Sequence, residues 1–151
     1  SIYENKHLNF ALENFDIDLV QLPLNIFDRR LIDNGMLKLL SQKGLEVHAR
    51  SIFLQGLILM ENSSRPRKFD RWDSLWKSWS EWLNDYKISP LEASVRYAIS
   101  FSEISKVLVG IDSVNQLIEI MDAASGVLPP IPNELYTDDS LLLNPSNWDH
   151  I

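Results

Sequence analysis

Three short segments of this chain place polar side chains and glycine directly after runs of apolar residues. The segments cover residues 21–25 (QLPLN), 51–56 (SIFLQG) and 110–113 (GIDS). If the apolar runs are parallel strands, the segments meet at the carboxyl edge of one sheet, where α/β proteins bind ligands. The third segment also leads into a predicted helix, whose free N–H groups and dipole favour a phosphate. The same pattern, a glycine and a serine before a helix, has a second interpretation: it is more often a plain helix cap than a phosphate site.

The spacing of apolar residues predicts the elements that position these segments. Helical spacing predicts helices over residues 4–15, 29–43, 71–86, 90–102 and 113–124. Short runs of β-forming residues predict strands over residues 18–22, 45–52 and 106–110. Ser89 and Glu92 are placed as a capping box around Pro90, and Gly44 suits the position just beyond a helix end.

The order of these elements predicts the fold class. Strands that alternate with helices indicate an α/β fold with a parallel sheet built from βαβ units. Three strands are too few to close an ordinary barrel, so we expect part of a (β/α)8 TIM barrel. Residues 1–151 are predicted to form a single partial domain, with a half barrel over 1–124 and an irregular, proline-bearing tail over 125–151.

The composition argues against several classes of function. The 151 residues include 14 Lys and Arg and 21 Asp and Glu, a net charge of −7, which disfavours nucleic acid and anionic membranes as partners. The absence of cysteine excludes disulfides, thiolate catalysis and Cys-bound metals, and the three histidines form no metal-binding motif. No apolar run approaches the length that spans a bilayer and no signal peptide is visible, so we expect a cytoplasmic protein.

Four stretches follow one another with compatible spacing over roughly residues 1–124. They are DLVQLPLN (18–25), RSIFLQGL (50–57), SPLEASVRY (89–97) and VLVG (107–110), the last followed by Gln116 and Leu117. Together they resemble the carboxyl-terminal half of an aldo-keto reductase, and RSIFLQG resembles members encoded among bacterial surface-polysaccharide genes. The resemblance implies strands six to eight of a barrel and reduction of an aldehyde or ketone by NADH or NADPH. Because the chain also begins without Met, we expect a fragment.

The resemblance also implies a cofactor site, without a metal. Ser1 and Gln21 match positions that hold the nicotinamide carboxamide. The residues that match the loop over the pyrophosphate are Ser51, Phe53, Gln55 and Gly56. The residues that match the adenosine-binding segment are Gly110, Ser113, Gln116 and Glu119. Asp112 lies where a basic or hydroxyl residue often meets the 2′-phosphate of NADP. A carboxylate there would repel phosphate but accept a hydrogen bond from a ribose hydroxyl, so NADP and NAD both remain open.

Other positions depart from the family pattern. Ile2 and Ile120 stand where the family commonly has Asn, and Leu24 stands where an aromatic ring often stacks on the nicotinamide. The family's catalytic Asp, Tyr, Lys and His come from its first four strands, so no catalytic residue is assigned and the chain alone is predicted to be inactive. Two hypotheses remain: the cofactor-binding half of a carbonyl reductase, or a non-catalytic binding or assembly module on a degenerate barrel. Exposed sheet edges predict a homo-oligomer or association with a missing amino-terminal half.

Four further groups have a structural and a functional interpretation. The tryptophan stripe within 71–86 is expected to pack against a neighbouring helix, with a lid or partner surface as the alternative. His48 is expected to be a hydrogen-bonded structural residue and not a ligand or acid/base group. The basic cluster over 65–71 is expected to be a solvated loop, with contact to a phosphate or an acidic substrate as the alternative. The carboxylates expected at the surface or at caps are Asp16, Asp18, Asp28 and Asp33.

Overall fold

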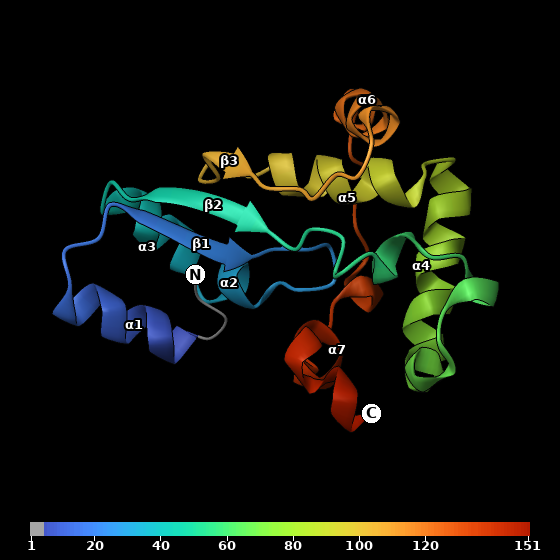
Figure 1. Ribbon diagram of the computed structural model, residues 1–151, viewed down its shortest axis with the longest axis horizontal. Helices are drawn as coiled ribbons and strands as arrows, with labels where there is room; N and C mark the ends of the chain where they lie inside the picture. The colour runs from blue at the N-terminus through green and yellow to red at the C-terminus, as the bar shows by residue number, and fades with distance from the viewer. Residues whose placement is uncertain (1–4) are drawn as a thin grey trace.

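The computed structural model describes residues 5–151, and within that stretch three parallel strands form one sheet with helices around it (Figure 1). The strands pair in the order β1 (Leu19–Pro23), β2 (Glu46–Arg50) and β3 (Lys106–Val107). The helices are α1 (Asn5–Asn14), α2 (Arg30–Asp33), α3 (Met36–Gln42), α4 (Asp73–Tyr86), α5 (Pro90–Ile99), α6 (Val114–Ala123) and α7 (Ser140–Leu143). The short 3-10 helices are η1 (Leu57–Leu59), η2 (Asn62–Ser64), η3 (Arg67–Trp72), η4 (Asn133–Leu135) and η5 (Pro145–His150). None of the helices in the described stretch is long and apolar enough to cross a membrane.

The strand register gives the sheet one apolar face and one polar face. Side chains alternate between the faces along each strand, and the parallel register aligns them in rows. The apolar rows pair Val20 with Val47 and Leu22 with Ala49, all of them buried. The polar face carries the row of Gln21, His48 and Lys106. Helices α2 and α3 lie behind β1 and β2 in Figure 1, and the buried leucines of α3 join the apolar rows in one core.

Helix starts follow the predicted caps. The backbone N–H of Glu92 donates to Ser89 Oγ at 3.2 Å, and the Ser89 N–H donates to Glu92 Oε2 at 2.9 Å, so the capping box at α5 is confirmed. Ser113 caps α6 by accepting from the Gln116 N–H at 3.2 Å. These short-range bonds satisfy N–H groups that a helix leaves without partners, which explains why local sequence predicts them.

One predicted helix is divided in two. The apolar spacing over 29–43 predicts a single helix, whereas α2 ends at Asp33 and α3 begins at Met36. Gly35 takes a left-handed φ of 71°, and Asn34 Oδ1 accepts from the Met36 N–H at 3.0 Å. Asn followed by Gly is a turn signal, and its local bonds compete with the continuous helix. Gly44, just beyond the end of α3, has a φ of 76°, as its predicted position requires.

Two strands end earlier than predicted. The strand predicted over 45–52 stops at Arg50, because Ser51 has a left-handed φ of 59° that an extended strand does not accept. The strand predicted over 106–110 retains regular pairing only at Lys106 and Val107. One further hydrogen bond between the two strands follows β3, because the Leu108 N–H donates to the Ala49 carbonyl at 2.8 Å.

The tryptophan stripe is buried, as its packing role predicted, but its ring partner is Phe27 in the loop after β1, where a neighbouring helix was expected. The buried indoles belong to Trp72, Trp76, Trp79 and Trp82. Phe27 packs edge-on against Trp76 and Trp79, with centroid distances of 5.4 and 5.3 Å. The buried Trp76 N–H donates to the Phe69 carbonyl at 2.9 Å. Aromatic burial joins the loop after β1 to α4 and accounts for the stripe without a lid role.

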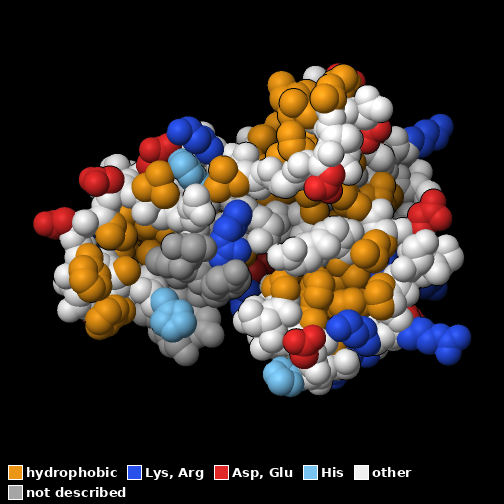
Figure 2. Space-filling model, viewed as in Figure 1, with side chains coloured by type: hydrophobic (Ala, Val, Ile, Leu, Met, Phe, Trp, Pro, Cys, Tyr) orange, Lys and Arg blue, Asp and Glu red, His pale blue; other side chains and the backbone are white. Residues whose placement is uncertain are grey.

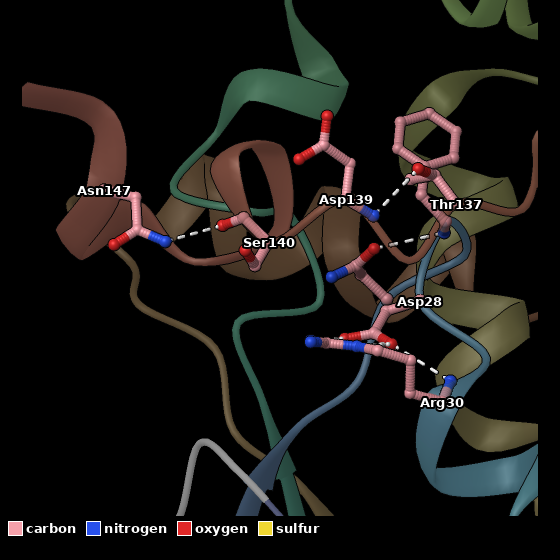
Figure 3. A network of polar contacts seen from close by, with 8 residues as sticks. Asp28, Arg30, Thr137, Asp139, Ser140 and Asn147 are labelled. Carbon is pink, nitrogen blue, oxygen red and sulfur yellow. Dashed lines mark hydrogen bonds and ion pairs between the residues drawn. The ribbon is translucent and has the colours of Figure 1, made fainter. Parts of the chain in front are cut away.

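Two charged residues differ from their predicted settings, Arg65 in the basic cluster and Asp28 among the carboxylates, while the other members of both groups are exposed as predicted. Arg65 is not part of a solvated loop: its half-buried guanidinium lies 3.8 Å from the Trp76 ring centroid and donates to Asn62 at 2.9 Å. Asp28 acts as a cap but is buried and not at the surface. Its Oδ2 lies 2.7 Å from Arg30 Nη2, and its Oδ1 accepts from the Arg30 backbone N–H (Figure 3). A carboxylate enters the core here because a cation two residues away satisfies it.

The tail over 125–151 is more ordered than predicted. Three of its leucines are buried, at positions Leu135, Leu142 and Leu143. Thr137 donates its N–H to the Phe27 carbonyl at 2.9 Å, and Trp72 donates its indole N–H to Asp139 Oδ2 at 2.9 Å. Within the tail, the Asp139 N–H donates to Thr137 Oγ1 at 3.1 Å and Asn147 Nδ2 donates to the Ser140 carbonyl at 2.9 Å (Figure 3). The tail therefore combines short helical turns and irregular segments, and it packs its leucines into the core.

Candidate functional site

A cleft of about 900 Å³ opens beside the carboxyl end of β2 and is walled by α5 and α6. Its apolar lining consists of Ile52, Phe53, Leu59, Pro90, Leu91, Leu108, Val109 and Ile120. Its polar and glycine lining consists of Arg50, Ser51, Gln55, Gly56, Ser89, Gly110, Asp112, Gln116 and Glu119. A mainly apolar concavity with a few convergent polar groups is the usual form of a small-molecule or cofactor site.

The loop after β2 holds an unusual backbone conformation. Ser51, Leu54 and Gln55 have left-handed φ values of 59°, 47° and 57°, and Gly56 follows at 82°. Such values are costly for residues other than glycine and collect at ligand-binding sites. The buried side chains of Ile52 and Leu54 anchor the loop, and the Leu54 N–H donates to the Ser51 carbonyl at 2.9 Å. Phe53 and Gln55, which alternate with these anchors, line the cleft.

Bonds between side chains and backbone N–H groups hold the start of α6, on one side of the cleft. Gln116 Oε1 accepts from the Asp112 backbone N–H at 2.7 Å, while the Gln116 N–H is taken by Ser113. Two N–H groups at the start of α6 therefore already have acceptors. The carboxylates of Asp112 and Glu119 add negative charge to this side of the lining.

Arg96 links α5, one wall of the cleft, to the end of α6, the other wall. Its Nη2 lies 2.6 Å from Glu92 Oε1, and its Nε donates to the Ala123 carbonyl at 3.1 Å. Figure 1 shows α6 almost end-on above α5. Glu92 also accepts from the Ser89 N–H, and the bonds from Ser89 lower the pKa of this carboxyl below its ordinary value, with a smaller contribution from Arg96.

Arg50 belongs to the lining although sequence reasoning assigned it no role. It is the last residue of β2 and is half-buried, and its Nη1 donates to Ser51 Oγ at 3.1 Å. The alternation of Glu46, His48 and Arg50 along one face of a strand was the signal that could have singled it out.

His48 is hydrogen-bonded on the polar face, as predicted. Its Nε2 lies 2.8 Å from Glu46 Oε1, and Lys106 Nζ lies 3.2 Å from the same oxygen. The bonds from His48 and then Lys106 lower the pKa of the Glu46 carboxyl. This polar cluster lies outside the cleft lining and joins β2 to β3 through the pair of Glu46 and Lys106.

The cleft brings together most of the predicted site residues but not all of them. Those in its lining are Ser51, Phe53, Gln55, Gly56, Gly110, Asp112, Gln116 and Glu119. Gln21 lies half-buried within β1, opposite His48, and Ser113 serves as the α6 cap; neither lines the cleft. Leu24 is fully buried in the core, and Ser1 and Ile2 lie outside the described residues.

Comparisons with known proteins point to one family. The sequence model of the family described as "Aldo/keto reductase family" matches residues 3–131. The aldo-keto reductase AKR11C1 from Bacillus halodurans in its holo form has a TM-score of 0.59 at 14% identity, covering 85% of this chain and 44% of its own. Its apo form has a TM-score of 0.58 at 15% identity, covering 88% and 47%. No curated protein compared with the chain gave a significant match.

The structural likeness confirms the fold at low sequence identity. The described strands and helices superpose on about half the length of a reductase barrel, which agrees with three parallel strands in an open sheet. The family model spans most of the chain, including the loop after β2 and all of α6. The chain belongs to the aldo/keto reductase family.

Proposed function

We propose that the cleft binds the dinucleotide of an NAD(P)H-dependent carbonyl reductase, and that this chain contributes the cofactor-binding half of that reductase. The observation that carries this proposal is the convergence of the 51–56 loop and the start of α6, far apart in sequence, on one cleft. When bound, the cofactor supplies the hydride that reduces an aldehyde or ketone. The chain's own residues bind and orient it.

The lining suits a dinucleotide in size and in chemistry. A volume of about 900 Å³ lies within the range of cofactor sites. Apart from the adjoining residues, no described atom lies within 4 Å of the point where a Cβ would stand at Gly56 or Gly110, so the backbone there is open to a ligand. Ser51 and Gln55 would hydrogen-bond polar groups of the cofactor, while Phe53 and Ile120 would exclude water from its flat rings.

We propose that NAD is preferred over NADP. A 2′-phosphate beside α6 would meet the carboxylates of Asp112 and Glu119, and the Asp112 and Gln116 N–H groups are already bonded within the protein. Like charges repel, whereas a ribose 2′-hydroxyl donates a hydrogen bond to a carboxylate. The same reasoning predicts that Asp112→Asn relaxes the preference.

The groups that transfer the proton to the substrate are proposed to lie outside this chain. Tyr97 is buried in α5, and burial raises the pKa of its hydroxyl, so it is unsuited to donate a proton to a ligand in the cleft. Tyr136 is partly buried and its pKa is also raised by burial, and its ring lies 4.1 Å from the Arg29 guanidinium. Neither residue lines the cleft.

A complementary barrel half is the proposed partner of this chain. The exposed side of α6 is apolar, with Val114, Leu117, Ile118 and Met121 at the surface (Figure 2). The solved relatives are about twice as long as the matched stretch, so a complementary half has the size needed to cover this surface and the outer edges of β1 and β3. A homo-oligomer is the competing arrangement. Native mass spectrometry of the chain alone and of the chain with an added amino-terminal half would separate the two.

Direct titration tests the proposed cofactor. The purified chain is titrated with NADH and NADPH by calorimetry, together with the Asp112→Asn variant and Asp149→Asn as a charge-matched control outside the cleft. We expect NADH to bind more tightly than NADPH, and Asp112→Asn to narrow the difference while the control leaves it unchanged. Lack of binding of both cofactors, alone and with the complementary half, would favour the non-catalytic module instead.

A further inference from the structure

We propose that the exposed apolar face of α6 docks an amphipathic helix whose apolar residues are bordered by Lys or Arg. This inference rests on the proposed function and deepens it, because it states the chemistry by which the complementary barrel half would recognise this chain. The face consists of Val114, Leu117, Ile118 and Met121, which we call the α6 stripe.

The spacing of the α6 stripe is that of a helix-packing surface. Its residues recur at i, i+3, i+4 and i+7, so at about 3.6 residues per turn they fall within about 100° of the helix circumference. Their exposed fractions run from 41% for Leu117 to 73% for Val114, and Figure 2 shows hydrophobic side chains gathered over α6. Apolar side chains at this spacing are the anchors with which one helix lies against another protein surface.

The α6 stripe is separate from the cleft. The cleft takes Gln116, Glu119 and Ile120 from other positions of α6, and no residue of the stripe is in its lining. A dinucleotide in the cleft would therefore leave the stripe uncovered. The described part of the chain, residues 5–151, leaves it exposed as well. A contiguous apolar surface of this kind marks an interface with another polypeptide.

The charge around the α6 stripe favours one kind of partner. Residues 107–151 contain seven Asp and Glu and no Lys or Arg, so this part carries the whole net charge of −7 and the first 106 residues are neutral overall. Asp122 lies one turn after Ile118, at the border of the stripe, and is exposed. Arg96, which bonds the end of α6, is already paired with Glu92. This excess of negative charge attracts a helix that carries Lys or Arg beside its apolar residues.

The same charges disfavour a second copy of this chain as the occupant. Two α6 stripes in contact would bring two sets of exposed carboxylates together, and residues 107–151 contain no Lys or Arg to compensate them. Like charges that face one another across an interface oppose association. A complementary half with a basic border would cover the same apolar side chains without this repulsion.

Peptide binding, measured by fluorescence anisotropy, tests the proposal. The probes are three labelled synthetic peptides of about 18 residues, long enough to form a helix. One has leucines at helical spacing bordered by lysine, one has glutamate in place of each lysine, and one has the residues of the lysine peptide in shuffled order. The proteins are the wild-type chain, Ile118→Gln, Asp122→Lys and two controls at exposed positions outside α6, Leu39→Gln and Asp149→Lys. Circular dichroism shows that each variant is folded.

The expected pattern depends on both the apolar residues and the charge. The wild type should bind the lysine peptide at least about tenfold more tightly than the other two peptides. Ile118→Gln should weaken that binding about tenfold, because an apolar anchor is lost from the stripe. Asp122→Lys should narrow the preference for lysine over glutamate, because it reverses the charge at the border of the stripe. Both controls should match the wild type.

Three results would overturn the proposal. One is equal binding, or no binding, of the lysine and glutamate peptides. Another is equal binding of the ordered and shuffled peptides. The third is self-association of the wild type, measured by sedimentation, that Ile118→Gln abolishes, because a second copy would then occupy the stripe. The cofactor proposal fails separately, if NADH does not bind to the wild type while peptide binding still depends on Ile118.

Discussion

Replacing Gly126 with alanine should weaken the attachment of α6, one wall of the cleft, to α5. The residue follows α6 with a left-handed φ of 108°, and a Cβ added there would lie 2.8 Å from Arg96 Cζ. Alanine in such a backbone costs about 1–2 kcal/mol. The close contact also forces Arg96 away from its bonds to the Ala123 carbonyl and Glu92, which costs about 1.5–3 kcal/mol. We therefore expect Gly126→Ala to destabilise the chain by about 2.5–5 kcal/mol.

Urea denaturation, followed by tryptophan fluorescence, measures this effect in a double-mutant cycle with Arg96→Ala. Without the arginine side chain only the backbone strain remains, so Gly126→Ala should cost about 1–2 kcal/mol in that background. The difference of about 2 kcal/mol between the backgrounds is the coupling between the two residues. Gly126→Ala should also weaken NADH binding, because α6 is held to α5 through Arg96. A cost below about 0.5 kcal/mol, or an equal cost in both backgrounds, would refute the reasoning.

Three further results are expected. The pKa of Glu92 lies below its ordinary value of 4.5 in the folded chain, so the capping box stabilises the fold above that value, and this contribution is lost as the pH falls through the lowered pKa. Ser89→Ala should lower the free energy of unfolding by about 1 kcal/mol at pH 7, and it should weaken the pH dependence of the urea midpoint between pH 5 and pH 3. A pH dependence equal to that of the wild type would contradict the capping box as its cause. Met121→Lys should weaken association measured by native mass spectrometry without lowering the urea midpoint, whereas Lys77→Met, a change at an exposed position of α4, should not affect association. Asp112→Asn should improve NADPH binding several-fold and leave NADH binding within about twofold, since an exposed carboxylate acts mainly by repulsion.

Local sequence predicted the elements because their signals are short-range. The capping box at α5, the Ser113 cap and the glycine after α3 each depend on bonds or dihedral angles within a few residues. The break in the helix predicted over 29–43 also has a local signal, which is Asn34 followed by Gly35. The prediction of one continuous helix relied on the apolar spacing and did not use this signal. The order of strands and helices sufficed for a parallel open sheet, and the four stretches of family resemblance agree with the family match over residues 3–131.

The sequence by itself determined where most of the longer helices and the strands lie, the order in which they alternate, and the stretches that reach the carboxyl edge of the sheet. The tertiary structure alone decided that the 51–56 loop and the start of α6 form one cleft, that Arg50 lines it, and that Gln21 does not. The burial of Asp28 and of the tail leucines likewise depends on packing between distant segments, which no local pattern records. Periodicity reports which face of an element is apolar, whereas a site depends on left-handed backbone turns and contacts between distant segments, and both are settled only when the core packs.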